Sequence, residues 1–159
     1  MKVFFQDIGV PTKNRAELVD ITQDVEGTVR GSEIRNGLCI IHSVHSTTAI
    51  IVNENEAGLA KDILKKVQQE YEKGADWLHD KVDDNADAHL ASSFIGSTRM
   101  FPVREGRSER GTWQNIFLLE SDGPRPRRIV VEVLGMRSHE HRASEQARAN
   151  FSRILTLHS

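Results

Sequence analysis

The sequence has a single cysteine, Cys39, so no disulfide can form within the chain. Cys39 lies in an apolar run, and buried thiols in such runs are usually inert as nucleophiles. No apolar run approaches the ~20 residues of a membrane-spanning helix, and the segment 1–7 becomes polar too early for a signal peptide. These absences favour a reducing compartment, and we expect a cytoplasmic protein without membrane contact.

An excess of either charge is also missing. The 21 basic and 23 acidic residues leave a formal net charge of −2. Three basic residues cluster late in the chain, at Arg125, Arg127 and Arg128, but acidic residues elsewhere offset them. Because a strong basic excess is what attracts nucleic acid or an anionic membrane surface, this composition predicts neither partner.

Simple metal-binding motifs are missing as well, since the chain contains neither a His-Glu-x-x-His sequence nor a pair of cysteines. What is present is the composition of an ordinary globular protein, with 38% hydrophobic and 28% charged residues. A chain of 159 residues is long enough for one hydrophobic core. We therefore expect a single domain over residues 1–135, followed by an extension over 136–159.

Hydrophobic periodicity predicts strands at both ends of this domain and helices between them. The predicted strands cover 2–10, 17–22, 38–44, 49–52, 98–103, 111–120 and 127–134. The predicted helices are a short one that ends at Gly31, an amphipathic one from Ala60 to Tyr71, and a short one over 90–96. This order predicts an α+β fold with compact, mixed or antiparallel, sandwich-like sheets and inserted helices.

Several residues mark the expected ends of these elements. Gly37 is expected in a turn before the strand 38–44, and Gly135 at the end of the last strand. Asn53 is expected to cap the amphipathic helix, and Glu56, three residues later, to close a capping box. A polar insert, residues 45–48, separates two apolar strands and is more than a simple hairpin needs, so we expect functional residues there.

The extension 136–159 has a different texture from the domain. Apolar residues recur at helical spacing among charged ones, at Ala143, Ala147, Phe151, Ile154 and Leu155. This pattern predicts an amphipathic helix. The helix could dock on its own domain or on a neighbouring subunit, and docking on its own domain is the simpler expectation.

Three histidines, His45, His79 and His89, lie where an apolar segment changes to a polar loop. Neutral imidazole is a common ligand of transition metals, and three such ligands leave positions for water or substrate. We predict a catalytic site with these histidines as metal ligands and with Glu54 or Asp84 nearby, sharing a divalent ion with a phosphate. The spacing leaves open that the histidines are separate surface residues and that both carboxylates only cap helices.

Other polar residues near the predicted ends of elements are candidates for binding substrate or phosphate: Asn53, Ser92, Ser93, Thr98 and Gln114. Backbone N–H groups at a strand-to-helix junction, and hydroxyl groups around Gly96, can receive a phosphate. Gln114 lies in an apolar strand and needs a hydrogen-bond partner, which a ligand could supply. The alternatives are a helix cap for Asn53 and an ordinary helix end for the hydroxyl residues, and Trp113 is expected in the core.

Several ordered blocks of the sequence resemble one known family. The first is His45-Ser-Thr-Thr-Ala followed by Asn53-Glu-Asn, and the second is Asp84-Asn-Ala-Asp-Ala-His-Leu with Ser92-Ser and Gly96. Pro102-Val, Gly106-Arg, Gly111-Thr-Trp-Gln and Asp122-Gly-Pro-Arg with Arg127-Arg continue the match. From the first strand to Gly135, the chain resembles the secondary thiamine-phosphate synthase family, also called YjbQ-like.

The resemblance implies an α+β fold, a homotrimer, and a site near a subunit interface that contains the matched histidines and holds a metal or an anion. It also implies weak thiamine-phosphate synthase activity, in which a hydroxymethylpyrimidine diphosphate and a thiazole phosphate give thiamine phosphate and pyrophosphate. Ser46 departs mildly from the threonine that is usual in the family, and the extension 136–159 lies beyond the usual family end.

Three functions therefore compete for the same residues. In a synthase, a divalent ion such as Mg²⁺ or Zn²⁺ would stabilise the departing pyrophosphate, and the pyrimidine would need an aromatic or apolar wall, for which Trp113 is a candidate by composition. In a metal-dependent phosphoester hydrolase, the same ion would activate water. The third possibility is a non-catalytic trimeric protein that binds a metabolite or a metal.

Overall fold

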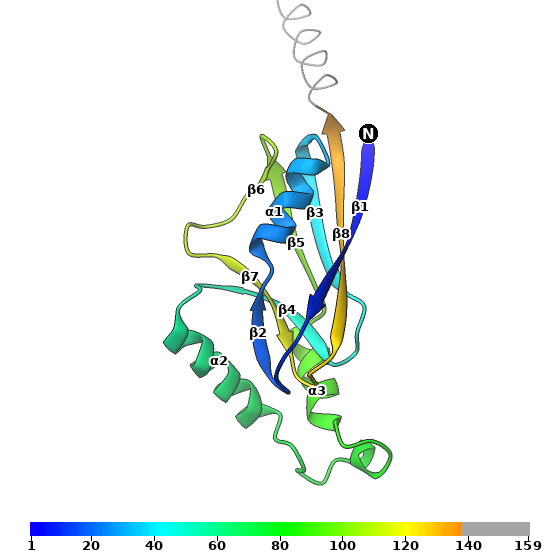
Figure 1. Ribbon diagram of the computed structural model, residues 1–159, viewed down its shortest axis with the longest axis vertical. Coiled ribbons are helices and arrows are strands. Elements are labelled where there is room, and N and C mark those ends of the chain that lie inside the picture. The colour runs from blue at the N-terminus through cyan, green and yellow to red at the C-terminus, as the bar shows by residue number, and fades with distance from the viewer. Residues whose placement is uncertain (138–159) are drawn as a thin grey trace, which may run out of the picture.

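The computed structural model describes residues 1–137 and shows the predicted α+β fold, with two antiparallel sheets and few helices (Figure 1). The elements in chain order are β1 (Lys2–Pro11), β2 (Glu17–Asp20), α1 (Thr22–Gly31), β3 (Ile34–Ser43), β4 (Thr48–Asn53), α2 (Ala57–Glu70), the 3₁₀ turn η1 (Leu78–Lys81), α3 (Ala86–Ile95), β5 (Thr98–Arg104), β6 (Arg107–Ser108), β7 (Asn115–Glu120) and β8 (Pro126–Arg137). The helix expected after β8 falls on residues 138–159, outside the described part of the chain.

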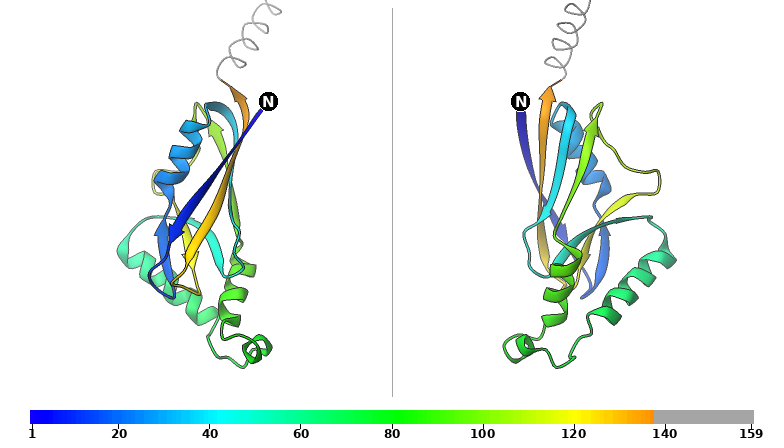
Figure 2. Two further views of the ribbon diagram at one scale, coloured as in Figure 1. Left: turned by 45° about the vertical axis from the view of Figure 1, so that its right-hand side comes forward. Right: turned by 180° about the vertical axis from the view of Figure 1, so that it is seen from behind.

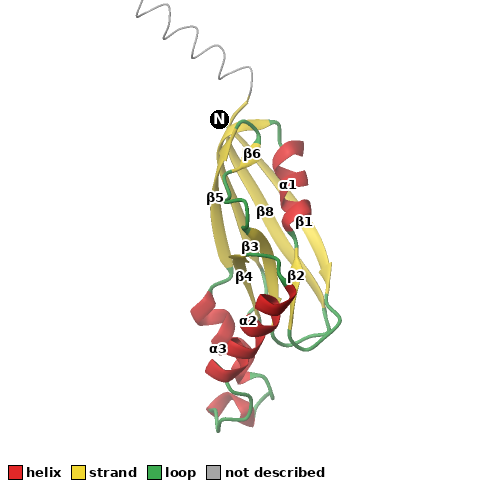
Figure 3. Ribbon diagram, turned by 90° about the vertical axis from the view of Figure 1, so that its left-hand side faces the viewer, coloured by secondary structure: helices red, strands yellow, loops and turns green. Residues whose placement is uncertain are grey.

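The larger sheet has five strands in the order β1-β8-β3-β5-β6, and the smaller has three in the order β2-β7-β4. Helix α1 and the smaller sheet lie on the same face of the larger sheet (Figures 1 and 3). The core fills the space between them. Its fully buried members include Val25 of α1, Ile41 and Val131 of the larger sheet, and Ile50 and Leu118 of the smaller one.

The opposite face of the larger sheet, which we call the outer face, is covered by no described element (Figure 2, right). Side chains alternate between the two faces of a strand, so apolar residues at alternate positions point outward here. Val3 and Phe5 of β1 remain 47% and 61% exposed, and Met100 of β5 remains 56% exposed. Leu38 of β3 is 37% exposed on the same face. A sheet face with several exposed apolar side chains is a candidate surface for protein–protein contact.

Two glycines do not act as the sequence predicted. Gly37 lies inside β3 and not in a turn, and Gly135 lies inside β8, which continues to Arg137. The two glycines are directly opposite each other in the pairing of β3 with β8. A Cβ atom on Gly37 would lie 1.9 Å from the carbonyl oxygen of Leu134, so the strands approach too closely there for any side chain.

The helix starts also differ from the prediction. Glu56 itself is the N-cap of α2, and its carboxylate accepts the backbone N–H groups of Gly58 and Leu59, at 2.7 Å each. Asn53 stays in β4 and is not the cap, because the chain needs residues 54–56 to turn from strand to helix. Helix α3 begins at Ala86, four residues earlier than expected, and this places His89 within the helix.

Cys39 is fully buried in β3, as the sequence predicted. Burial, aided by the negative charge of Glu26, raises the pKa of its thiol to about 12. The thiol therefore stays protonated and inert at neutral pH. Among residues 1–137, no helix is both long enough and apolar enough to cross a membrane.

Candidate functional site

A polar cavity of about 350 Å³ opens at the end of the molecule where α3 meets the larger sheet. Three parts of the chain line it: the connection from β3 to β4, the start of α3, and the connection from β7 to β8. Its lining residues are Val44, His45, Ser46, Thr47, Asp83, Asn85, His89, Asp122, Arg125 and Arg127. The fold thus brings His45 and His89, which are far apart in the sequence, to one cavity.

A buried ion pair between Glu120 and Arg127 forms the base of this cavity. Their side chains are 0% and 5% exposed. The contact is bidentate, with Nε of Arg127 2.5 Å from one carboxylate oxygen and Nη2 2.6 Å from the other. Nη2 also donates to Oγ1 of Thr47 at 3.0 Å, which fixes the connection from β3 to β4. Because Glu120 balances its charge, Arg127 mainly holds the cavity in shape.

Glu120 is bonded on every side, which keeps it ionised. The hydroxyl of Thr12 donates to it at 2.9 Å, and the backbone N–H groups of Ser121 and Asp122 donate at 2.9 and 2.8 Å. Burial alone would raise the pKa of Glu120, but the hydrogen bonds from Arg127, Asp122 and Thr12 outweigh burial and lower it. Three segments of the chain are thereby joined to one carboxylate.

His45 is held in one protonation state by the backbone. Its Nε2 atom accepts the N–H of Arg128 at 2.9 Å, so in the neutral ring the proton resides on Nδ1. Burial lowers the pKa of His45, the positive charges of Arg127 and Arg128 lower it further, and Glu120 opposes them in part. At neutral pH, His45 is therefore a neutral ring with Nδ1–H as its hydrogen-bond donor.

Asn85 contributes a buried amide to the same cavity and is only 6% exposed. Its Nδ2 atom donates to Asp122 at 3.1 Å and to Asp83 at 3.3 Å. Its Oδ1 atom is buried and has no hydrogen-bond partner among the described residues. An acceptor left in this state costs free energy unless a ligand or water donates to it, so the cavity is incomplete without one.

His79 and His89 contact each other directly. Their ring centroids are 4.9 Å apart, in an edge-to-face arrangement with an interplanar angle of 77°. His89 lines the polar cavity, whereas His79 lies outside its lining, on the exposed turn η1. Of the three predicted histidines, two therefore line the polar cavity and the third touches one of them.

Asp84 and Thr98, two further predicted site residues, have other partners. The carboxylate of Asp84 forms an exposed ion pair with Lys73 at 3.0 Å. The hydroxyl of Thr98 lies 2.8 Å from Nδ1 of His42, on the exposed side of β3 and β5. Neither residue lines the polar cavity. Asp83 and Asp122 are the carboxylates that do, and sequence reasoning did not select them for the site.

Ser92 and Ser93 lie on α3 and bond to backbone carbonyl groups. The hydroxyl of Ser92 donates to Thr48 at 2.7 Å and is buried, which ties α3 to the start of β4. The hydroxyl of Ser93 donates to His89 at 2.8 Å within the helix. Because both hydroxyl hydrogens are already donated, only the hydroxyl oxygens remain, and these are acceptors, whereas a phosphate needs hydrogen-bond donors. A phosphate contact by either residue stays a prediction.

Asn53, Glu54 and Gln114 lie at the other end of the smaller sheet. Asn53 is opposite Asn115 at one end of the β4–β7 pairing, and Thr48, next to the polar cavity, is at the other end. Five steps along a strand span roughly 17 Å, so these residues of one chain cannot contact a ligand of the polar cavity. Gln114 has an internal partner, because its side-chain oxygen accepts the N–H of Gly111 at 2.7 Å.

A metal site of three histidines does not fit the geometry of one chain. Within residues 1–137, no three His, Cys, Asp or Glu side chains are arranged to hold a metal ion. His45 already uses Nε2 to accept a backbone N–H, and His79 does not line the polar cavity. Metal binding by His45, His79 and His89 stays a prediction.

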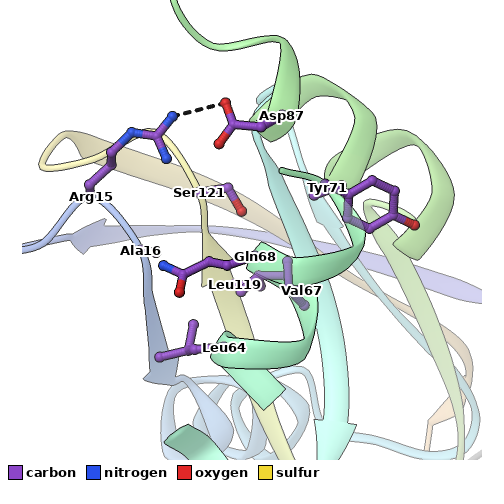
Figure 4. Close-up of a pocket in the computed structure, with 10 residues that line it drawn as sticks. Arg15, Ala16, Leu64, Val67, Gln68, Tyr71, Asp87, Leu119 and Ser121 are labelled. Carbon is purple, nitrogen blue, oxygen red and sulfur yellow. Dashed lines mark hydrogen bonds and ion pairs between the residues drawn. The ribbon is translucent and has the colours of Figure 1, made fainter. Parts of the chain in front are cut away.

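A second, much smaller cavity of about 20 Å³ lies between α2, α3 and β7. Figure 4 shows Arg15 bound to Asp87 across it, at 2.9 Å, with Leu64 and Val67 of α2 on the opposite wall. This volume has room for a single water molecule. The cavity is therefore a packing seam between α2 and the rest of the fold and is too small for a substrate.

Comparison with known proteins places the chain in a family. The sequence profile described as "UPF0047 protein YjbQ-like" matches residues 6–136. A UPF0047 protein from Methanothermobacter thermautotrophicus is 44% identical over 85% of this chain and 94% of its own length. Another, from Archaeoglobus fulgidus, is 42% identical over 80% of this chain and 99% of its own length.

Solved structures agree with this assignment. A YbjQ-like protein from Sulfolobus solfataricus P2 superposes with a TM-score of 0.84 and 55% sequence identity, over 85% of this chain and 99% of that one. A hypothetical protein from Aeropyrum pernix K1 superposes with a TM-score of 0.82 and 38% identity, over 84% of this chain and 99% of that one. The chain therefore belongs to the UPF0047 protein YjbQ-like family.

Proposed function

We propose that this protein joins a hydroxymethylpyrimidine diphosphate to a thiazole phosphate, giving thiamine phosphate and pyrophosphate. In this reaction the thiazole nitrogen attacks the methylene carbon attached to the pyrimidine. The bond from that carbon to the diphosphate oxygen breaks, and pyrophosphate leaves with the bonding electrons. Negative charge grows on the leaving group, so a catalyst must place hydrogen-bond donors or cations beside it.

The observation that carries the proposal is the meeting of His45, His89 and Arg125 at one polar cavity. These side chains supply N–H donors, which are the groups that bind phosphate oxygens most strongly when they are charged or preorganised. His45 is preorganised because Arg128 fixes its tautomer. A cavity of about 350 Å³ is of the size that encloses a small metabolite.

Hydrogen-bond donors and cations form one half of the polar cavity, which we call the donor half, and its residues have distinct roles. Thr47 accepts a hydrogen bond from Arg127, so its own hydroxyl hydrogen is free to be donated to a phosphate. The Arg125 side chain is 55% exposed and is held by Asp122 at 3.0 Å. It is the cation that can turn toward an anionic ligand. Arg127 is bound too tightly to Glu120 to move and supports Thr47 instead.

The acceptor half of the cavity supports a substrate that also carries N–H groups. Asp83 and Asp122 line the cavity beside the unpartnered oxygen of Asn85. A pure anion would be repelled by the two carboxylates. The exocyclic amino group of a pyrimidine that carries a diphosphate can donate to this half while the diphosphate accepts from the other half, and the ring itself then extends past His89, out of the polar cavity.

We also propose that the protein works as a homotrimer. The uncovered outer face of the larger sheet supports self-association, because Phe5 and Met100 are more than half exposed there. Self-association would also give Asn53 and Glu54 a role. They are exposed and too far from the polar cavity of their own chain, so a neighbouring chain is the one whose cavity they can complete.

Replacing His89 with alanine tests the function. Purified protein is mixed with the hydroxymethylpyrimidine diphosphate and the thiazole phosphate, and thiamine phosphate is measured after chromatography. We expect at least about a tenfold loss of kcat/KM for His89→Ala, because an interaction with the reacting groups is removed. Gln69→Ala is the control, since Gln69 is exposed on α2 and lies neither in the polar cavity nor on the outer face of the larger sheet.

Two results would overturn the proposal. One is the absence of thiamine phosphate with the unmodified protein at any substrate concentration. The other is equal turnover by His89→Ala and Gln69→Ala. Release of inorganic phosphate from the substrates would instead identify a phosphoester hydrolase, and saturable binding without any product would identify a non-catalytic metabolite-binding protein.

A further inference from the structure

Another cavity, of about 290 Å³, shares His89 with the polar cavity. It is lined by Trp77, Leu78, His79, Ala86, His89 and Leu90. These residues come from η1 and from the first turn of α3, together with the residue before η1. Their side chains are apolar or aromatic, in contrast to the charged lining of the polar cavity. We call this space the apolar cavity.

The aromatic and imidazole rings of the apolar cavity are held in place by contacts within the protein, without a ligand. The indole Nε1–H of Trp77 donates to the backbone carbonyl of Glu72 at 2.8 Å, and the side chain is half-buried. The ring of His79 stands edge-on to the ring of His89. A ligand that enters the cavity therefore meets three ordered rings, and little conformational entropy is lost in arranging them.

The turn that carries these rings is itself anchored to α3. The carboxylate of Asp80 accepts the N–H of Ala86 at 3.0 Å, and the N–H of Asp80 donates to the carbonyl of Trp77 at 3.2 Å. On this fixed turn, Leu78 is nevertheless 78% exposed. When an apolar ligand covers this leucine, apolar surface is removed from water, which makes the free energy of binding more favourable.

We infer that the apolar cavity binds the planar heteroaromatic ring of a phosphorylated substrate whose phosphate lies in the polar cavity. Aromatic side chains favour stacked or edge-to-face contact with such a ring, and Leu78 and Leu90 close its apolar sides. His89 lies between the two cavities and contacts both parts of the substrate. This inference deepens the proposed function and rests on it only for the identity of the ring, a pyrimidine. Binding of the ring itself can be measured without turnover.

The structure corrects one expectation about tryptophan. Trp113 does not lie in the core, because it is 70% exposed, and it lines neither cavity of its own chain. The loop 111–114 turns outward before β7 begins at Asn115, so the predicted strand starts later. Trp77 is the tryptophan at the site. The chain has two tryptophans, so Trp113→Phe leaves Trp77 as the sole indole reporter.

The test uses fluorescence of the full chain with Trp113→Phe. Hydroxymethylpyrimidine monophosphate is the probe with a ring, and inorganic phosphate is the probe without one. We expect the first to change Trp77 fluorescence and to saturate. Leu78→Ala in the same background should raise its Kd about tenfold, because the ring loses an apolar contact of several carbon atoms. Isothermal titration should show the Kd for inorganic phosphate unchanged within about twofold.

Val82→Ala is the matched control. Val82 is 83% exposed in the same part of the chain and does not line the apolar cavity. Equal Kd values for Leu78→Ala and Val82→Ala would overturn the inference, as would a parallel loss of inorganic phosphate binding in Leu78→Ala. If the ring probe binds as expected but no thiamine phosphate is ever formed, the ring site stands and the proposed function fails. If thiamine phosphate is formed and Leu78→Ala does not alter KM, the proposed function stands and the ring site fails.

Discussion

At the scale of single residues, His45 shows how the fold controls chemistry through one backbone hydrogen bond. The Arg128 N–H points at Nε2 of the ring, so a second proton on the ring would place two N–H groups against each other. Burial and the charges of Arg127 and Arg128 act in the same direction and lower the pKa of His45. The ring is thus kept as a neutral donor in the range where free histidines titrate.

This arrangement predicts the pH dependence of stability. The pKa of His45 is lower in the folded chain than its ordinary value of about 6.5. As the pH falls below that value, the unfolded chain takes up the proton first, so the free energy of unfolding decreases until the folded pKa is reached. Urea unfolding at several pH values between 5 and 8 should show wild type losing stability relative to His45→Gln. Parallel curves for the two proteins would contradict the lowered pKa of His45.

The ion pair between Glu120 and Arg127 shows which residues sequence reasoning cannot find. Glu120 ends one apolar strand and Arg127 begins the next, and charges at such positions are normally solvated. Periodicity describes one element at a time, so it cannot show that the turn between two strands brings a carboxylate and a guanidinium together. The resemblance to a family marked Arg127 as part of a shared block, but gave it no partner.

At the scale of elements, the glycine pair of β3 and β8 allows a close approach of two strands in the larger sheet. Gly37→Ala should destabilise the fold by roughly 3 kcal/mol or more, because the new Cβ meets the backbone of Leu134 and not a flexible side chain. Gly27→Ala on α1 is the control. Nothing lies within 4 Å of its Cβ position, and alanine in a helix should stabilise by about 0.5–1 kcal/mol. Thermal unfolding of both variants checks the difference, and equal midpoints would refute the close approach.

The same glycine explains why some element boundaries were missed. Gly37 follows Asn36, a pair typical of turns, but in this fold it allows two strands to approach. The strands themselves were predicted well because their apolar runs are long and bounded by turn residues. Glu56 and Asn53 are both good capping residues, and the choice between them depends on the path from β4 to α2, which no local pattern encodes.

At the scale of the whole molecule, the topology decides which predicted residues can act together. His45 and His89 meet because β3, β8 and α3 all have an end at the same side of the molecule. Asn53 and Glu54 follow His45 closely in the sequence, yet β4 carries them to the opposite end of the smaller sheet. Sequence proximity was therefore misleading within one chain, and in the proposed homotrimer a second chain would bring these residues to the site.

The outer face of the larger sheet is where those chains should meet. We expect light scattering after size exclusion to give the mass of three chains for the full-length protein. Phe5→Ser should shift the mass toward one chain, because Phe5 is 61% exposed on the outer face, with Val3 on the same side of the edge strand β1. Serine at this position exposes less apolar surface to water in the monomer than phenylalanine does, so the monomer should stay folded.

Phe94→Ser is the matched control, since Phe94 is 75% exposed and lies on α3, where its ring stacks on Tyr71, and not on a strand of the larger sheet. It should keep the mass of three chains. A monomeric wild type would contradict the trimer, and loss of association by Phe94→Ser alone would place the interface on α3 instead. If Phe5→Ser also lowers kcat/KM while its Kd for hydroxymethylpyrimidine monophosphate stays unchanged, the neighbouring chain contributes to the reaction and not to ring binding. That result is expected if Asn53 and Glu54 of one chain complete the polar cavity of another.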